Sequence, residues 1–203
     1  MRQAKAFLTG EGDKWYERNK QAELDYTVVN TLCGLDPKPN SILEVGCGNA
    51  RYLGELHRYF GGKAVGIDPS KKAIFEGRKA FPSLRLKHND AIPGLRWEWA
   101  LHYEYDLILF GFCLYILDRS DLFLAVAYSD AILKNGGFLA IHDFDPPKPK
   151  VVPYKHVEGL SSYKMDYSSL WLANPGYSLV YKAKTRDGEA ITIIRKTGWE
   201  KFK

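Results

Sequence analysis

A glycine loop followed by an acid is the part of this sequence whose spacing most directly indicates chemistry. The apolar run at residues 42–45 breaks into a loop that holds Gly46 and Gly48, and a second β-type run, residues 64–67, ends at Asp68. Glycine lets a backbone approach a ligand closely, and the helix that the pattern predicts after the loop begins with unpaired N–H donors. An acid that closes the second strand is placed to bind the hydroxyls of a ribose. The stretch therefore predicts a nucleotide site within one strand–helix–strand unit.

The small residues of this loop separate two kinds of nucleotide site. The dinucleotide fingerprint G-x-G-x-x-G is met at Gly46 and Gly48, but its third glycine is replaced by Arg51, whose long cationic side chain hinders close packing on a pyrophosphate. The stretch instead resembles motif I of the class I S-adenosylmethionine (SAM) methyltransferases, E/D-x-G-x-G-x-G. Glu44 stands in its acidic position, and Ala50 replaces its last glycine. An NAD-dependent oxidoreductase is the alternative that Arg51 disfavours.

The resemblance implies an α/β fold and SAM as the cofactor. The expected architecture is a Rossmann-like three-layer sandwich, with a seven-stranded, mostly parallel sheet that ends in an antiparallel hairpin. Residues 1–203 are expected to form a single domain, with residues 1–40 as a helical lid and linker and residues 41–203 as the core. A second family phrase, L-K-x-G-G-x-L, is matched at residues 133–139.

The resemblance also implies which residues hold the cofactor. The family places an acid against the adenine after the third strand, which points to Asp90, and Phe112 can stack on the adenine or flank the sulfonium. A leading helix commonly covers the site, so Tyr16, Arg18 or Asn19 can touch the methionine carboxylate. Turn formation and core packing are the alternatives for these residues. The full expected set is Tyr16, Glu44, Gly46, Cys47, Gly48, Asp68, Pro69, Asn89, Asp90, Ala91 and Phe110.

Methyl transfer to a hydroxyl requires a base within about 3 Å of the proton, directly or through one water. The candidates are His142 and Asp143, at the end of the fifth predicted strand, and His156 on the segment after it. An amine acceptor needs less help from a base and can use Tyr115 or Asp143 for positioning. The expected substrate-binding residues are Tyr115, Tyr154 and Lys155, the last of which can pair with a phosphate or carboxylate.

A metal site is the alternative use of the fifth strand's end. His142, Asp143 and Asp145 are metal-binding residue types. Neighbouring residues on an extended chain point in opposite directions, so this run is poorly suited to share one ion. No metal is expected.

Hydrophobic periodicity and turn residues predict the remaining elements. Residues 1–12 are expected to be mobile, and residues 15–32 to form one helix. Asn135-Gly136-Gly137 is expected to cap a long helix in the left-handed conformation, and Asp187-Gly188 to join a terminal hairpin. The other expected helices are 51–60, 70–79, 121–133 and 161–172, and the other strands are 84–88, 106–110, 138–141, 177–184 and 190–196.

Composition limits the partners. The chain has 203 residues and a net charge of +5, and its tight basic clusters, 71–72 and 148–150, suit a solvated surface. No signal peptide or membrane-spanning run is seen, and three cysteines without metal-like spacing suit reduced thiols in the cytoplasm. We expect a small-molecule substrate, no nucleic acid and no membrane, and leave a homodimer open.

A narrower resemblance concerns the acceptor. Residues 12–19 and 152–156 are similar to the G-D-x-Y-x-x-R-N and P-Y-[RK]-x-H segments of the methylases associated with pseudaminic acid biosynthesis, although Trp15 replaces the tyrosine of the first. This resemblance implies a hydroxyl of a sugar-like or nucleotide-sugar compound as the acceptor. The alternatives are an N-methyltransferase on a small amine, and a non-catalytic SAM- or nucleotide-binding module that activates a partner.

Overall fold

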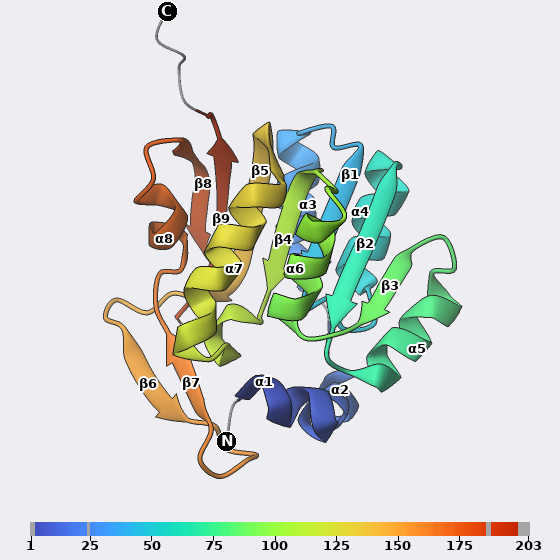
Figure 1. The fold of residues 1–203 in the computed structure, drawn as a ribbon, viewed down its shortest axis with the longest axis vertical. Coiled ribbons are helices and arrows are strands. Elements are labelled where there is room, and N and C mark those ends of the chain that lie inside the picture. The colour runs from blue at the N-terminus through green and yellow to red at the C-terminus, as the bar shows by residue number, and fades with distance from the viewer. Residues whose placement is uncertain (1–2, 24, 186–187, 199–203) are drawn as a thin grey trace, which may run out of the picture.

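The computed structural model describes residues 3–23, 25–185 and 188–198. A seven-stranded sheet in the order β3-β2-β1-β4-β5-β9-β8 forms its centre (Figure 1). Strands β1 to β5 are parallel, and β9 runs antiparallel to both β5 and β8. The expected mostly parallel sheet with a terminal antiparallel hairpin is confirmed. Its strands are β1 (Ser41–Val45), β2 (Lys63–Asp68), β3 (Arg85–His88), β4 (Tyr105–Gly111), β5 (Leu133–Phe144), β8 (Tyr177–Lys184) and β9 (Glu189–Lys196).

Helices cover both faces of the sheet and bury its central strands. All five residues of β1 are buried, including Ser41 and Glu44, as expected for a central parallel strand that is covered on both faces. One core cluster joins the sheet to α3 (Thr27–Leu35), α4 (Arg51–Phe60) and α5 (Lys71–Ala80). The other joins the opposite face to α6 (Ala91–Ala100), α7 (Arg119–Ile132) and α8 (Ser168–Leu172). The result is the expected three-layer sandwich.

The N-terminal segment differs from the expected mobile start and single helix. Its elements are α1 (Gln3–Ala6), a π-helical turn η1 (Phe7–Glu11) and α2 (Gly12–Asn19), and they lie at the edge of the sheet where the parallel strands end (Figure 1). The chain then leaves the helical path and starts α3 anew, because the Asp25 carboxylate accepts the backbone N–H of Thr27 at 3.0 Å. Such a local bond competes with continued helix. Leu24, part of the expected helix, lies outside the described residues.

Two further expectations about the elements were wrong. Residues 135–137 do not cap a helix, because α7 ends at Ile132 and the chain enters β5 directly. Gly136, at φ 85°, instead lies at a bulge where the pairing of β5 with β4 shifts register. The segment 161–172 is helical only in α8, because β7 (Ser161–Lys164) pairs antiparallel with β6 (Lys150–Pro153). We call β6, β7 and the residues between them the arm.

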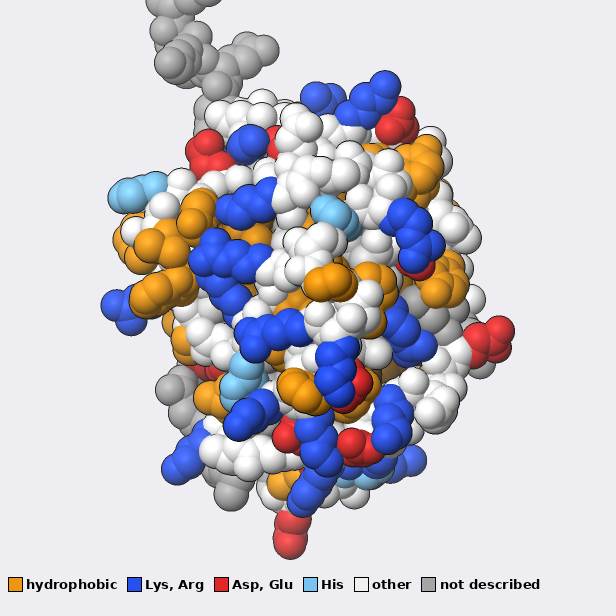
Figure 2. Space-filling model, turned by 90° about the vertical axis from the view of Figure 1, so that its right-hand side faces the viewer, with side chains coloured by type: hydrophobic (Ala, Val, Ile, Leu, Met, Phe, Trp, Pro, Cys, Tyr) orange, Lys and Arg blue, Asp and Glu red, His pale blue; other side chains and the backbone are white. Residues whose placement is uncertain are grey.

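The terminal hairpin is confirmed in its pairing, although Asp187 of the expected turn lies outside the described residues. Within the described residues, no helix has the length and apolar character needed to cross a membrane. Figure 2 shows Lys and Arg side chains spread over the side on which α5 and β3 lie, with acidic side chains among them. Some of these basic and acidic side chains form ion pairs, such as Lys72–Glu17 and Lys79–Glu76, both at 3.2 Å.

Candidate functional site

The glycine loop between β1 and α4 is held in a conformation that its residues make possible. Gly46 and Gly48 have φ of 78° and 54°, and a Cβ on Gly46 would lie 2.7 Å from the Cβ of Cys113. Ala50 also adopts a left-handed φ of 64°, which is uncommon for a residue with a side chain. The backbone N–H groups of Gly46 and Cys47 both donate to the Ile67 carbonyl, which fixes the loop to the end of β2.

Asp68, the last residue of β2, lies next to this loop in the folded chain. Its carboxylate accepts the Gly48 N–H at 2.8 Å and the Ser70 N–H at 2.7 Å. Burial raises the pKa of Asp68 to about 6, although the two backbone bonds oppose the rise. A carboxylate has about four acceptor positions, so Asp68 retains acceptor capacity toward the cavity that it lines.

Glu44 is the second buried acid of the loop. Its carboxylate accepts the Leu53 N–H in the first turn of α4 at 3.1 Å, and burial raises its pKa well above the usual range. A bond to a helix N-terminus partly offsets that burial. Glu44 therefore both holds the helix that follows the loop and faces a cavity on the other side.

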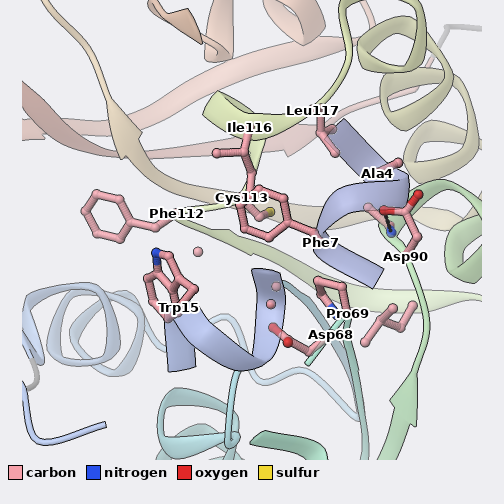
Figure 3. A pocket seen from close by; sticks show the side chains of 15 residues that line it. Ala4, Phe7, Trp15, Asp68, Pro69, Asp90, Phe112, Cys113, Ile116 and Leu117 are labelled. Carbon is pink, nitrogen blue, oxygen red and sulfur yellow. Dashed lines mark hydrogen bonds between the residues drawn. The ribbon is translucent and has the colours of Figure 1, made fainter. Parts of the chain in front are cut away.

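Two cavities meet at the end of the parallel strands. The first chamber is partly open to solvent, and its walls are mostly apolar apart from Asp68 and Asp90. Figure 3 shows Asp68, Pro69 and Asp90 on one side of it, facing Phe7 and Trp15 of the N-terminal segment. The Asp90 carboxylate caps α6 by accepting the Ala91 N–H at 2.7 Å. An apolar lining with a few polar groups is typical of a small-molecule site.

The second chamber shares four wall residues with the first: Trp15, Gly46, Gly111 and Phe112. Figure 3 shows the Trp15 and Phe112 rings together at one end of the first chamber. The second chamber is more polar, and its other walls include Tyr16, Glu23, Asp25, Glu44, Cys47, Gly48, Arg51, His142 and Glu189. The break between α2 and α3 thus supplies part of this wall. The two chambers are therefore neighbours, with Trp15 and Phe112 at their common wall.

Phe112 is held by its backbone in an unusual conformation. Its φ is 46°, and its N–H donates to the His142 carbonyl at 2.8 Å. Its ring centre lies 4.5 Å from that of His142, and 5.8 Å from that of Phe144. A bulky residue at positive φ is strained and persists only where its surroundings fix it.

Asp143 supplies much of that support. Its buried carboxylate accepts the backbone N–H of Leu114 at 2.9 Å and of Phe144 at 2.7 Å, and those of Cys113 and Tyr115 also face it. Burial nevertheless raises the pKa of Asp143 to about 7. Asp143 is not among the described residues that line either chamber. Because its oxygens accept backbone N–H groups of the loop that carries Phe112, we interpret Asp143 as a residue that positions this loop, and its predicted role as a base stays untested.

The other predicted site residues lie in the first chamber, in the second chamber or outside both. The first chamber contains Gly46, Asp68, Pro69, Asp90 and Ala91, and the second contains Tyr16, Glu44, Gly46, Cys47 and Gly48. His142, 1% exposed, also lines the second chamber, at the end of β5.

Phe110 was a wrong choice, because its side chain is fully buried in the core with its ring 5.6 Å from that of Trp171.

A third group lies outside both chambers. The Asn89 side chain accepts the Asp90 N–H at 3.0 Å, and Tyr115 is buried against Phe144, with ring centres 5.0 Å apart. His156 is exposed on the arm, with its ring centre 5.5 Å from that of Tyr154, and it does not meet His142 in either chamber. Lys155 is exposed beside it.

The two segments of the narrower resemblance fasten the N-terminal segment down. The Asp13 carboxylate accepts the Ser70 hydroxyl at 2.7 Å and the Lys72 N–H at 2.9 Å. Buried Glu11 accepts the Arg18 guanidinium at 2.5 Å and the Tyr154 hydroxyl at 2.8 Å. Tyr154 thus joins the arm to the segment that covers the first chamber. We call residues 3–19 the lid.

The metal alternative finds no support in the geometry. Asp145 pairs with Lys182 at 3.0 Å and with Lys184 at 2.7 Å. Among the residues that the structure describes, no group of three or more His, Cys, Asp and Glu side chains can hold a metal ion. All three cysteines are free.

Several wall residues were not foreseen. Ala4 and Phe7 of the lid line the first chamber, and Glu189 lines the second. Glu189 begins β9 directly after the hairpin turn, and no local pattern marks it as a site residue. Phe7 has a signal only in retrospect, as an isolated aromatic residue in a polar start.

Residues 42–137 match the model of a family described as a methyltransferase domain. No curated protein matches the chain at a significant level. Together, this match and the fold define an enzyme that transfers methyl groups. The chain is a SAM-dependent methyltransferase of class I; the family match supports the activity, and the solved structures support the fold.

Solved structures show the fold over nearly the whole chain. The 1,6-didemethyltoxoflavin-N1-methyltransferase of Burkholderia thailandensis, crystallised with its substrate and S-adenosylhomocysteine, aligns with a TM-score of 0.72 at 15% identity over 95% of this chain and 88% of that one. DesVI of Streptomyces venezuelae gives 0.63 at 17% identity over 94% and 95%. A TehB-like SAM-dependent methyltransferase of Corynebacterium glutamicum gives 0.63 at 18% identity over 94% and 98%.

Proposed function

We propose that the enzyme methylates a hydroxyl of a small, sugar-like acceptor, with the cofactor spread over both chambers. Asp68 would hold the ribose, because it is buried at the cavity wall with acceptor capacity left. Asp90 and Ala91 would read the adenine, and Gly46, Glu44 and Tyr16 would hold the methionyl end. The loop fits a close ligand, since a Cβ at Gly48 would meet nothing within 4 Å, so the backbone there is open to the second chamber that it lines.

The observation that carries this proposal is that the two chambers lie side by side at the glycine loop and share Trp15, Gly111 and Phe112 as wall residues. SAM, when bound, supplies a methyl group already activated by a positive sulfonium. The chain's own task is then chiefly alignment. Trp15 and Phe112 would fix the reacting centre from two sides, and the lid would exclude water by closing the first chamber. Aromatic faces also attract a cation.

His142 is the proposed base. It lies in the second chamber beside Phe112, and a ring nitrogen of His142 would take the hydroxyl proton as the new bond forms. Its position at the end of β5 is set by pairing with β4 and β9 on both sides. In this proposal both chambers bind the cofactor, and the second also carries the base.

A second candidate is methylation of a ring nitrogen or a small amine. One structural neighbour is named as an N1-methyltransferase of didemethyltoxoflavin. The second chamber also carries the carboxylates of Glu23, Asp25 and Glu189, which suit a basic acceptor. Such an acceptor would need His142 less, so the two candidates differ in how strongly the rate depends on that residue.

One experiment tests the proposal. Isothermal titration with S-adenosylhomocysteine and with NAD comes first, followed by release of S-adenosylhomocysteine from SAM with a panel of sugars, sugar acids, nucleotide sugars and amines. We expect binding of S-adenosylhomocysteine only, and turnover with hydroxylated ring compounds. Binding of NAD alone would contradict the cofactor assignment, and turnover confined to amines would select the second candidate.

The wider setting is also proposed. We place the enzyme in the cytoplasm, acting as one domain over residues 1–203 on a small molecule, without nucleic acid. A homodimer is the assembly to test by light scattering.

A further inference from the structure

The arm carries lysines that lack the acidic partners found elsewhere at this end of the molecule. Lys182 pairs with Asp145 and Asp166, and Lys184 with Asp145. No ion pair joins Lys150, Lys155 or Lys164 to an acidic side chain within residues 3–23, 25–185 and 188–198. The arm is therefore a local excess of positive charge.

Two of these lysines face each other across the arm. Lys150 and Lys164 are direct partners in the antiparallel pairing of β6 with β7. Residues directly opposite in such a pair project from the same face, and like charges there are destabilising. A local conflict of this kind is typical of a functional position.

Lys164 is also drawn away from water. Its side chain is half-buried, and its ammonium lies 3.5 Å from the centre of the Phe144 ring. Burial, followed by the charge of Lys150, lowers its pKa; the charges of Glu189 and Asp143 oppose this shift, and that of Lys155 adds to it. A half-buried cation held by an aromatic face and no carboxylate can still form ion pairs.

Phe144 links this cation to the site. Its ring packs on Phe112, which lines both chambers, and on Tyr115. Lys164 therefore stands one aromatic ring away from the wall that the two chambers share. A ring-shaped acceptor beside Phe144 could therefore have the methylated atom at the chambers and a charged group at Lys164.

We infer that Lys150, Lys155 and Lys164 bind an anionic group of the methyl acceptor, a phosphate or a carboxylate, an assignment that rests on the proposed function. The acceptor is then an acidic ring compound, such as a sugar acid or sugar phosphate. Its ring lies along Phe144 and Phe112, and its charge stays on the arm.

The test is a titration of the isotope-labelled protein, with and without S-adenosylhomocysteine, using inorganic phosphate in one arm and acetate in the other. Backbone amide shifts of β7 report binding. We expect saturable shifts in the millimolar range, weakened at least fivefold in Lys164→Ala. The stronger of the two probes identifies the type of group.

Lys79→Ala is the matched control. Lys79 also lies over a phenylalanine ring, Phe75, at 4.1 Å, but it pairs with Glu76 and has no opposing lysine. Its replacement should change the anion affinity less than twofold. Equal weakening by both variants, or no saturable shift in the wild type, would overturn the inference.

Lys150→Glu separates binding from folding. It converts the like-charged pair with Lys164 into an attractive one, so the melting temperature should rise by about 1–3 °C while anion binding is lost. A lower melting temperature with retained binding would contradict the role of this pair. Failure of S-adenosylhomocysteine to bind would instead refute the proposed function, and the anion titration can be read independently of it.

Discussion

The two chambers are built in different ways, although they share a wall. The first is bounded by Gly46 of the glycine loop and by two carboxylates bonded to backbone, Asp68 on two N–H donors and Asp90 on the start of α6. The second is shaped by side chains from distant segments, among them Glu23, His142 and Glu189. A backbone-built site suits a ligand common to a whole fold, whereas a side-chain wall can change with the acceptor.

Replacement of the two histidines should give the largest difference. His142→Asn removes the proposed base from the second chamber, and we expect kcat to fall about 10²- to 10⁴-fold with unchanged affinity for S-adenosylhomocysteine. His156→Asn, on the exposed part of the arm, is the matched variant and should keep kcat within about twofold. Steady-state kinetics decides, and equal losses would remove the distinction between the two histidines.

Paired alanine variants test the glycine loop. Gly46→Ala places a Cβ 2.7 Å from the Cβ of Cys113 at φ 78°. We therefore expect the binding free energy of S-adenosylhomocysteine to weaken by about 2–5 kcal/mol, which is at least about 30-fold in affinity. Gly48→Ala has a similar φ but meets nothing within 4 Å, and should lose only about 1–2 kcal/mol. Titration calorimetry measures both. Equal effects would show that conformation, not space, limits this loop.

Asp143 should make stability depend on pH. Its pKa is about 7 when folded, above the usual value of 3.8, so the folded state binds more protons and its stability falls as pH rises through this range. Between pH 5 and 7 we expect the wild type to lose about 2 kcal/mol relative to Asp143→Asn. Urea unfolding at several pH values measures this difference. Parallel curves for the two proteins would contradict the raised pKa.

The smallest expected effect concerns the tie between arm and lid. Tyr154→Phe removes the 2.8 Å bond to Glu11, worth about 0.5–1.5 kcal/mol, so release of S-adenosylhomocysteine should quicken about two- to tenfold. Stopped-flow fluorescence follows the release, with Tyr59→Phe, a change at a 60%-exposed surface position, as the control. An unchanged release rate would mean that the lid opens without breaking this bond.

The sequence predicted the glycine loop and the acids of the two chambers better than the walls that distant segments supply. Gly46, Asp68 and the buried strands around them follow local rules, because a parallel strand reads as a continuous apolar run and a left-handed loop calls for glycine. Phe110 was mistaken for a wall residue because the side chains of β4 do not alternate between buried and exposed, so the sequence does not show which of them reach the cavities. The backbone reversal at Phe112, not the strand pattern, sends a ring into the chambers.

The second chamber depends on contacts that no short pattern contains. The helix break at Asp25 arises from one carboxylate–backbone bond. Hydrophobic periodicity cannot predict such a bond, because it considers only the spacing of apolar residues. The pairing of β6 with β7 and the position of Glu189 depend on segments that meet only after folding. The sequence shows Asp143 only as a carboxylate at a strand end, which is a suitable residue type for a base. Its structural role becomes visible only from the backbone N–H groups that donate to it in the fold.

The lid has a practical consequence for handling the enzyme. Gln3 is already buried, its backbone N–H donates to Asp118 and its side-chain oxygen accepts the Ser161 N–H. A purification tag or fusion partner joined just ahead of Gln3 would emerge beside the ligand cavities, whereas β9 ends at the opposite edge of the sheet (Figure 1). Tagged preparations that differ only in which end carries the tag should therefore differ in measured cofactor affinity.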